Sequence, residues 1–223
     1  MRVRRKAVAL ALFVVSLTSA HGLEPIATVG PPIQPDYLIP INPTERKYES
    51  EIEKLLGNRS GNGTMIYTEA TSSGRDFVVS AWGRDYVNDR HQKNFITLVE
   101  VSLESGGGLL KKYDSDVPID SEFAIAIQRA WATMLLKTRF PEHRHRGADG
   151  WQTEFSVFVR GLGAAYGQLW SPSEGLPKEL MDIGFCLADF CKLPEEKRKE
   201  SREAILQRLN AFTRNVSSKR RRR

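Results

Sequence analysis

The fold is decided by the stretch Asp149–Cys191, which reads DGWQTEFSVFVRGLGAAYGQLWSPSEGLPKELMDIGFCLADFC. This stretch holds two of the four Trp, both Cys and a dense run of apolar side chains. Its pattern predicts a β-hairpin that leads into a helix. We expect the rest of the chain to pack around it, because large apolar side chains are the ones most often buried.

Apolar and polar residues alternate in the first part of the stretch. Thr153 and Phe158 break the alternation, and Gly161 with Gly163 turns the chain back into a second strand at 164–170. An alternation of period two predicts a strand with one buried face. The side chains expected on that face are Trp151, Phe155, Val157 and Val159.

A helix is predicted to open at Pro177 and to bury one stripe of side chains. The stripe consists of Leu180, Ile183 or Gly184, Leu187 and Cys191. Cys186 and Cys191 lie five residues apart, so at about 100° per residue they point about 140° away from each other. A disulfide therefore requires the helix to loosen near Asp189. The alternative is two free thiols.

The remaining elements follow from capping residues and periodicity. Residues 104–120 contain GGG and the acidic run YDSDVPID, which predict a long connection. Asp120 is expected to cap the helix that follows. The predicted elements are a helix from Asn42 to Gly57, strands at 64–70, 75–83 and 95–103, a helix at 121–139 and a last helix from Pro194.

The predicted order is α-β-β-β-α-β-β-α-α. Strands joined by hairpins favour antiparallel pairing, and the helices need one apolar sheet face to cover. We therefore expect an α+β fold, with a mostly antiparallel sheet of about five strands and helices packed on one face. The predicted division is a signal peptide at 1–20, a Pro-rich linker at 21–42, a single domain at 43–214 and a disordered basic tail at 215–223.

Residues 1–20 have the order of a secretory signal peptide: a basic start, an apolar run at 7–17 and small residues at the end. The run is shorter than the roughly 20 residues that a membrane-spanning helix needs. Cleavage after Ala20 or after Gly22 fits, and an uncleaved anchor is the alternative. We expect a secreted or periplasmic protein with no transmembrane segment after cleavage. Six of the 11 Pro then lie between Pro25 and Pro43, which predicts an extended linker that spaces the fold or wraps over it.

The positive charge of the chain is concentrated at its two ends. The net charge is +6, but residues 1–20 and Lys219–Arg223 hold nine Lys/Arg and no acid, so the remaining 24 Lys/Arg and 27 Asp/Glu give −3. A nucleic-acid-binding domain normally carries a basic face, so no specific nucleic-acid partner is predicted. The tail Lys219–Arg223 can contact an anionic surface, or it can be a solubilising terminus.

The polar side of the hairpin is the best candidate for a ligand surface. An acid, a base, amides and an aromatic ring would come together there if the two strands pair in register, as in a groove for a small ligand or a glycan. The alternative is a solvated sheet face. The candidate residues are Gln152, Glu154, Arg160, Gln168 and Trp170.

Cleavage after Ala20 would make His21 the N-terminal residue, and a terminal His can bind copper through its amine and its ring nitrogen. The arrangement resembles that of lytic polysaccharide monooxygenases, which are exported and begin at such a His. The resemblance covers this one residue and its position, and it implies a second His from among His91, His143 and His145. The alternative is a remnant of signal cleavage.

Other metal sites have weaker support. His143 and His145 form an i, i+2 pair, but structural zinc needs four ligands, and a polar loop is favoured. Asp114, Asp116 and Asp120 lack the Gly and Glu of a calcium loop. No cofactor is therefore predicted.

The chain contains no G-x-S-x-G elbow, H-E-x-x-H motif or P-loop. We therefore expect a non-catalytic binding protein of the cell envelope, whose partner is an envelope protein or a glycan. The alternative is an exported hydrolase that acts on glycan or peptide through an acid pair such as Glu142 and Glu154. A copper enzyme with His21 at its N-terminus is the third hypothesis.

Overall fold

The structure is a computed structural model. It describes residues 36–41, 54–59, 61–69, 76–84, 93–103, 109–139 and 151–219. All of them belong to one compact unit, Ile33–Arg223.

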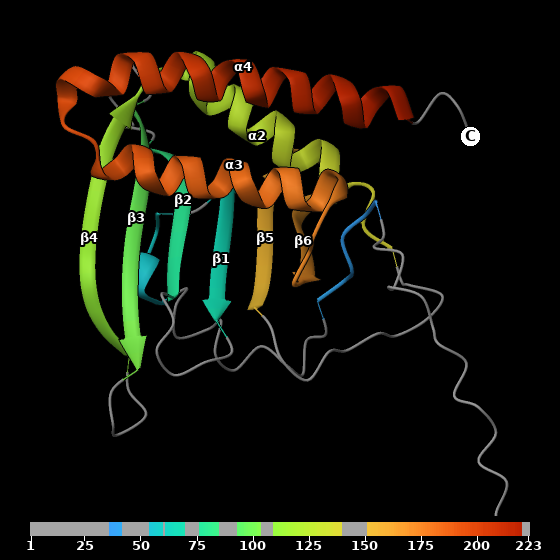
Figure 1. The fold of residues 1–223 in the computed structure, drawn as a ribbon, viewed down its shortest axis with the longest axis horizontal. Coiled ribbons are helices and arrows are strands. Elements are labelled where there is room, and N and C mark those ends of the chain that lie inside the picture. The colour runs from blue at the N-terminus through green and yellow to red at the C-terminus, as the bar shows by residue number, and fades with distance from the viewer. Residues whose placement is uncertain are drawn as a thin grey trace, which may run out of the picture. The chain divides into compact units, whose positions relative to one another are not determined.

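Six antiparallel strands form one sheet in the order β4-β3-β2-β1-β5-β6 (Figure 1). Each strand pairs with its neighbours in an unbroken antiparallel ladder, apart from a bulge between β3 and β4 at Glu100 and Val101. The strands are β1 (Gly63–Glu69), β2 (Asp76–Arg84), β3 (Lys93–Leu103), β4 (Leu109–Ile119), β5 (Trp151–Val159) and β6 (Gly163–Trp170). The α+β class, the antiparallel sheet and the cover of helices are confirmed.

The sixth strand, β4, corrects the prediction of a long connection at 104–120. Tyr113 and Val117 point to the helices, whereas Asp114 and Asp116 point to the other face. The run therefore alternates with period two, but its second face carries charges instead of apolar residues. It is also an edge strand, where charged residues and Pro118 are tolerated because one side of the ladder is unpaired.

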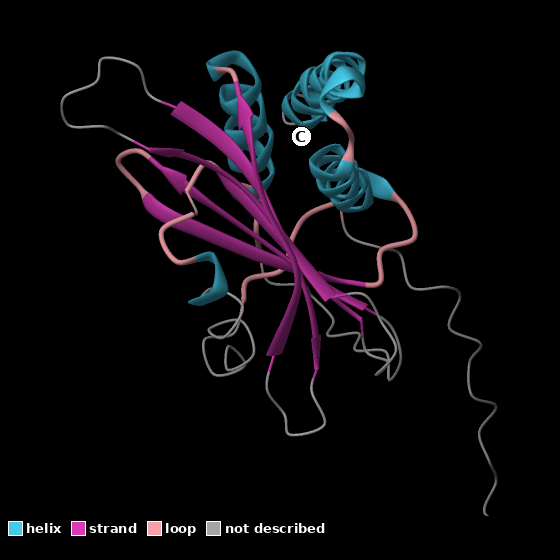
Figure 2. Ribbon diagram, turned by 90° about the vertical axis from the view of Figure 1, so that its left-hand side faces the viewer, coloured by secondary structure: helices cyan, strands magenta, loops and turns pink. Residues whose placement is uncertain are grey.

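Three helices lie on one side of the sheet, and a short helical segment at 54–56 lies on the other (Figure 2). This segment belongs to the helix predicted from Asn42 to Gly57, of which residues 42–53 lie outside the described ranges. We call these two sides the helix face and the outer face. The helices are α2 (Ser121–Leu135), α3 (Gly175–Lys192) and α4 (Glu195–Lys219). Asp120 caps α2 as predicted, because its carboxylate accepts a hydrogen bond from the Phe123 N–H at 2.9 Å.

The main core lies between the helix face and the helices. Met65, Phe77, Ile96 and Phe155 point into it from four different strands and are almost completely buried. Thr153 also faces this core, where its hydroxyl contacts the sulfur of Met181. Thr153 and Phe158 therefore do not break the alternation of β5, since Thr153 points inward and Phe158 points outward.

Gly184 of α3 lies directly over Met65 of β1. A Cβ atom at Gly184 would lie 2.2 Å from the Met65 sulfur, closer than side-chain atoms can approach. The helix comes this near to the sheet because position 184 has no side chain. Within the predicted apolar stripe of α3, the position that lies against Met65 of the sheet is therefore a glycine.

The last helix, α4, packs on α2 and α3 rather than on the sheet (Figure 1). It buries Ile205, Leu209, Phe212 and Val216. The helix runs to Lys219, so residues 215–219 are helical and not a disordered tail as predicted. Val216 explains the difference, because this single apolar residue among polar ones is completely buried.

Part of the predicted linker belongs to the fold. Ile39 pairs with Gln168 of β6 through two backbone hydrogen bonds of 2.9 and 2.7 Å, and Leu38 is fully buried in the core. Of the two roles predicted for the linker, this segment therefore wraps over the domain. No helix in the described part of the chain has both the length and the hydropathy of a membrane span.

Candidate functional site at the β5–β6 hairpin

The structure brings most of the predicted ligand-binding residues together. Gln152 lies opposite Trp170, and Glu154 lies opposite Gln168, in the antiparallel register of β5 and β6. Directly opposed residues share a sheet face, so these four side chains lie on the outer face. The register assumed from the sequence is therefore correct.

The polar members of this group form a closed cluster. The Gln152 amide donates to Glu154 Oε1 at 2.5 Å and to Gln168 Oε1 at 3.1 Å, and the Gln168 amide donates to the Pro40 carbonyl at 3.2 Å. Glu154 is only 7% exposed. The hydrogen bonds join β5, β6 and the segment 36–41, so these half-buried side chains hold one another and that segment in place.

Arg160 and Trp170, which were predicted to line the same ligand surface, take no part in this cluster of hydrogen bonds. Arg160 is exposed in the hairpin turn, six residues beyond Glu154, which is about 20 Å along an extended chain. Trp170 is partly buried, and its indole Nε1 is buried without a hydrogen-bond partner among the described residues. Arg160 therefore belongs to a different surface from the cluster.

The turn of the hairpin exposes apolar side chains that the sequence analysis did not select. Phe158 is 53% exposed, Leu162 is 71% exposed and Tyr166 is 37% exposed. Phe158 and Tyr166 lie on the outer face as diagonal neighbours, because Phe158 opposes Ala164 and Tyr166 opposes Ser156. We call Phe158, Leu162 and Tyr166 the apolar tip.

The backbone of the turn presents Leu162 to solvent. Gly161 and Gly163 have φ angles of +85° and +89°, in the region that glycine occupies without strain. The Phe158 carbonyl accepts a hydrogen bond from Gln128 of α2 at 3.3 Å, and its N–H donates to the Gly61 carbonyl at 2.7 Å. The tip is thus held at its base. One feature of the sequence indicates this surface: Phe158 is apolar but stands at a position of β5 where the alternation expects a polar residue.

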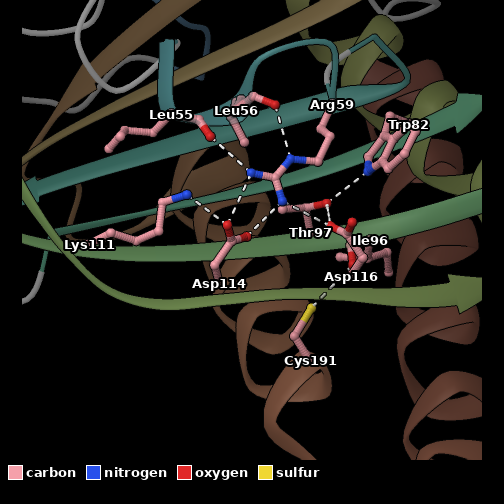
Figure 3. A network of polar contacts seen from close by, with 10 residues as sticks. All are labelled: Leu55, Leu56, Arg59, Trp82, Ile96, Thr97, Lys111, Asp114, Asp116 and Cys191. Atoms are coloured by element: carbon pink, nitrogen blue, oxygen red, sulfur yellow. Dashed lines mark hydrogen bonds and ion pairs between the residues drawn. The ribbon is translucent and has the colours of Figure 1, made fainter.

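A second polar network lies at the other side of the outer face (Figure 3). The Arg59 guanidinium donates to Asp114 at 2.7 Å and to the carbonyls of Leu55 and Leu56 at 2.9 and 3.0 Å. It thereby holds the turn at 54–59 against β4. Leu56 in turn covers a small apolar cluster on the outer face, formed with Ile66, Val78, Val99 and Val101.

The charges in this network neutralise one another. Asp114 contacts both Arg59 and Lys111. Burial alone would raise the pKa of this carboxyl, but the hydrogen bonds from the two cations lower the pKa below its usual value. The hydrogen bond from Arg59 to Asp114 raises the pKa of the guanidinium. The network therefore fixes one segment on the sheet, which is a structural role.

A chain of hydrogen bonds continues this network across the sheet. Trp82 Nε1 donates to the Thr97 hydroxyl at 2.7 Å, and that hydroxyl donates to Asp116 at 2.5 Å (Figure 3). Asp116 also contacts Arg59 at 3.2 Å. The hydrogen bonds thus connect one side chain from each of the strands β2, β3 and β4 to Arg59.

Among the residues that the structure describes, the predicted metal ligands do not form a metal site. His21, His91, His143 and His145 lie outside the described ranges. Asp114 and Asp116 face Arg59, and Asp120 caps α2, so these three do not form a calcium loop. Within the described ranges, no group of three or more potential ligand side chains could hold a metal ion.

The two cysteines are free thiols on an unbroken α3. Cys191 faces the sheet, and its sulfur lies 3.9 Å from the Ile96 carbonyl (Figure 3). Burial raises the pKa of the Cys191 thiol to about 12. Cys186 is half-buried and contacts Arg208 at 3.4 Å. The disulfide that the sequence left open is not formed here, because the helix does not loosen at Asp189.

No family model, no curated protein and no solved structure matches this chain.

Proposed function

We propose that the protein is an exported, non-catalytic binding protein of the cell envelope, and that it holds its partner through the apolar tip. The observation that carries the proposal is the exposure of Phe158, Leu162 and Tyr166 on one hairpin. Soluble domains expose single apolar side chains commonly, but a group of large ones is typical of an interaction surface.

The composition of the tip favours a protein partner over a glycan. Aromatic residues are enriched at the centres of protein interfaces, whereas Lys, Glu and Asp are depleted there. The turn and β6, residues 161–170, contain no charged residue. Leu162 offers a glycan no hydrogen bond, but it fits an apolar pocket on a protein surface.

Site-specific crosslinking tests the partner directly. A photoreactive phenylalanine analogue at position 162, irradiated in intact cells, is expected to give one dominant crosslinked product. The same analogue at Leu110, an exposed leucine on β4, is the matched control and should not give that product. Addition of Phe158→Ser should reduce the crosslink at 162. Equal crosslinking at both positions would contradict the proposal.

The export part of the proposal rests on residues 1–20 and needs its own experiment. Intact-mass and N-terminal analysis of the cell-derived protein should show a chain beginning at His21, Gly22 or Leu23. A chain that still begins at Met1 would exclude a cleaved signal peptide. A start at Gly22 or Leu23 would exclude the copper hypothesis, because that hypothesis requires His21 at the N-terminus.

The hydrolase alternative places Glu154 in an acid pair with Glu142. Glu142 lies outside the described residues, and the hydrogen bond from Gln152 to Glu154 is that of a structural acid. Turnover of glycan or peptide substrates by the purified protein, abolished by Glu154→Gln with the fold intact, would support the hydrolase and contradict our proposal.

A further inference from the structure

Helices α2 and α4 end at the same side of the molecule (Figure 1). Arg202, in the early part of α4, binds the α2 cap Asp120. Lys137, just beyond the end of α2, donates to the carbonyl of Val216 near the end of α4. The two helices therefore run in the same direction, and their C-terminal turns lie side by side.

This end of the helix pair is basic. Residues 129–139 and 204–223 contain no Asp or Glu. Arg139 and Arg214 are exposed, and after Lys219 the sequence continues with four more Arg, which lie outside the described residues. We call Lys137, Arg139 and Arg214 the basic end.

Helix stability does not account for so many cations. Basic residues near a helix C-terminus are favoured by the helix dipole, but that effect falls off within the last turn. The bond from Lys137 to Val216 already satisfies one terminal carbonyl. The sequence ends with five consecutive cations, Lys219–Arg223, and like charges so close together in the sequence repel one another unless an anionic partner is present.

Three features favour a lipid surface among anionic partners. Leu136 is 60% exposed in the same turn as Lys137, so an apolar side chain lies among the cations, as in segments that bind at membrane interfaces. Arg139 lies over the Tyr37 ring at 4.0 Å, which fixes its guanidinium while the residue stays exposed. The cations lie at the tips of two parallel helices and not along a groove, a shape that suits a flat surface better than a nucleic-acid strand.

We infer that the basic end binds the anionic phospholipid surface of a membrane, with the C-terminal turns of α2 and α4 toward the lipid headgroups. This contact is separate from the apolar tip and does not depend on the proposed function. Each cation near such a surface contributes about 1 kcal/mol, or about a fivefold change in affinity.

Vesicle co-sedimentation of the full chain tests the inference. The protein should bind vesicles of phosphatidylglycerol and phosphatidylcholine but not phosphatidylcholine alone, and high salt should release it because exposed charges are screened. Arg139→Gln with Arg214→Gln should weaken binding about 25-fold, the product of two fivefold losses. The lysine versions of both changes should bind like the wild type, which separates a charge effect from a local disturbance at Tyr37.

The matched control removes the same charge elsewhere. Lys112→Gln with Arg160→Gln removes two exposed cations from other parts of the chain. This variant should weaken binding less than threefold, because only cations near the surface contribute. Equal losses in the two double variants would overturn the inference, since they would indicate attraction by net charge. Unchanged binding by the Arg139 and Arg214 variant would overturn it too, because the sequence after Lys219 would then act alone. Binding of a single-stranded oligonucleotide as tightly as the vesicles would assign the basic end to nucleic acid instead.

Discussion

Arg202 of α4 binds both carboxylate oxygens of Asp120, the residue that caps α2. Its Nε lies 2.6 Å from Oδ2 and its Nη2 lies 2.9 Å from Oδ1. The same carboxylate accepts the Phe123 N–H. One side chain therefore starts α2 and also attaches it to α4.

The first prediction concerns the pH dependence of this contact. The hydrogen bond from Arg202 lowers the pKa of Asp120 below its model-peptide value of 3.8. A carboxyl with a depressed pKa in the folded state stabilises the protein above its unfolded pKa, and this stabilisation is lost as the pH falls through the folded pKa. Asp120→Asn should therefore flatten the decrease in stability below about pH 4, measured by urea denaturation at a series of pH values.

Asp120 is about half exposed, so solvent weakens its ion pair with Arg202. We therefore expect Asp120→Ala to lower the free energy of unfolding at neutral pH by about 1 kcal/mol, mainly because the helix cap is lost. Asp189→Asn, which removes an exposed acid on α3, is the control for the loss of one negative charge. Parallel pH curves for Asp120→Asn and the wild type would show that the contact does not contribute.

The second prediction concerns Gly184. Alanine in a helix is normally favoured over glycine by about 1 kcal/mol, so Gly184→Ala would stabilise the protein if there were room. The Met65 sulfur occupies the place of the new Cβ, and the core is close-packed around it. We expect a loss of about 1–3 kcal/mol in the free energy of unfolding. A gain measured by urea denaturation would mean that α3 lies further from β1.

The third prediction concerns Glu154. Glu154→Ala removes one of the two acceptors of the half-buried Gln152 amide and leaves a gap at a buried position, which should cost about 1–3 kcal/mol. Glu154→Gln keeps an acceptor oxygen and should cost less. Arg160→Gln, on the same hairpin but exposed, should change stability by less than about 0.5 kcal/mol. If Glu154→Ala melted at the wild-type temperature, Glu154 would be solvated, and the open ligand groove would again be supported.

The fourth prediction concerns the two thiols. A thiolate is the reactive form, and burial raises the pKa of Cys191 to about 12, so this residue should resist a maleimide reagent in the folded protein. Half-buried Cys186 should react first, and both should react in denaturant. Mass spectrometry counts the labels, and peptide mapping locates them. A denatured but unreduced sample that takes no label would instead show a disulfide between the two residues.

The sequence by itself determined the local elements. Asp120 was identifiable as a cap because its carboxylate satisfies a free N–H three residues later. The alternation of β5 and the glycines of its turn predicted the hairpin, because a hairpin depends on residues close together in the chain. The predicted strands at 64–70, 75–83, 95–103 and 164–170, and the predicted helix starts at 121, 177 and 194, lie within two residues of the observed bounds.

Only the tertiary structure decided which faces are covered. Asp114 and Asp116 resembled loop residues because their partner, Arg59, comes from a distant turn. Glu154 resembled a solvated residue, although Gln152 and Gln168 surround it in the fold. Val216 resembled part of a polar tail, although it is completely buried in the core. Burial depends on contacts between residues far apart in the sequence, so a local pattern predicts the faces of an element but not what lies against them.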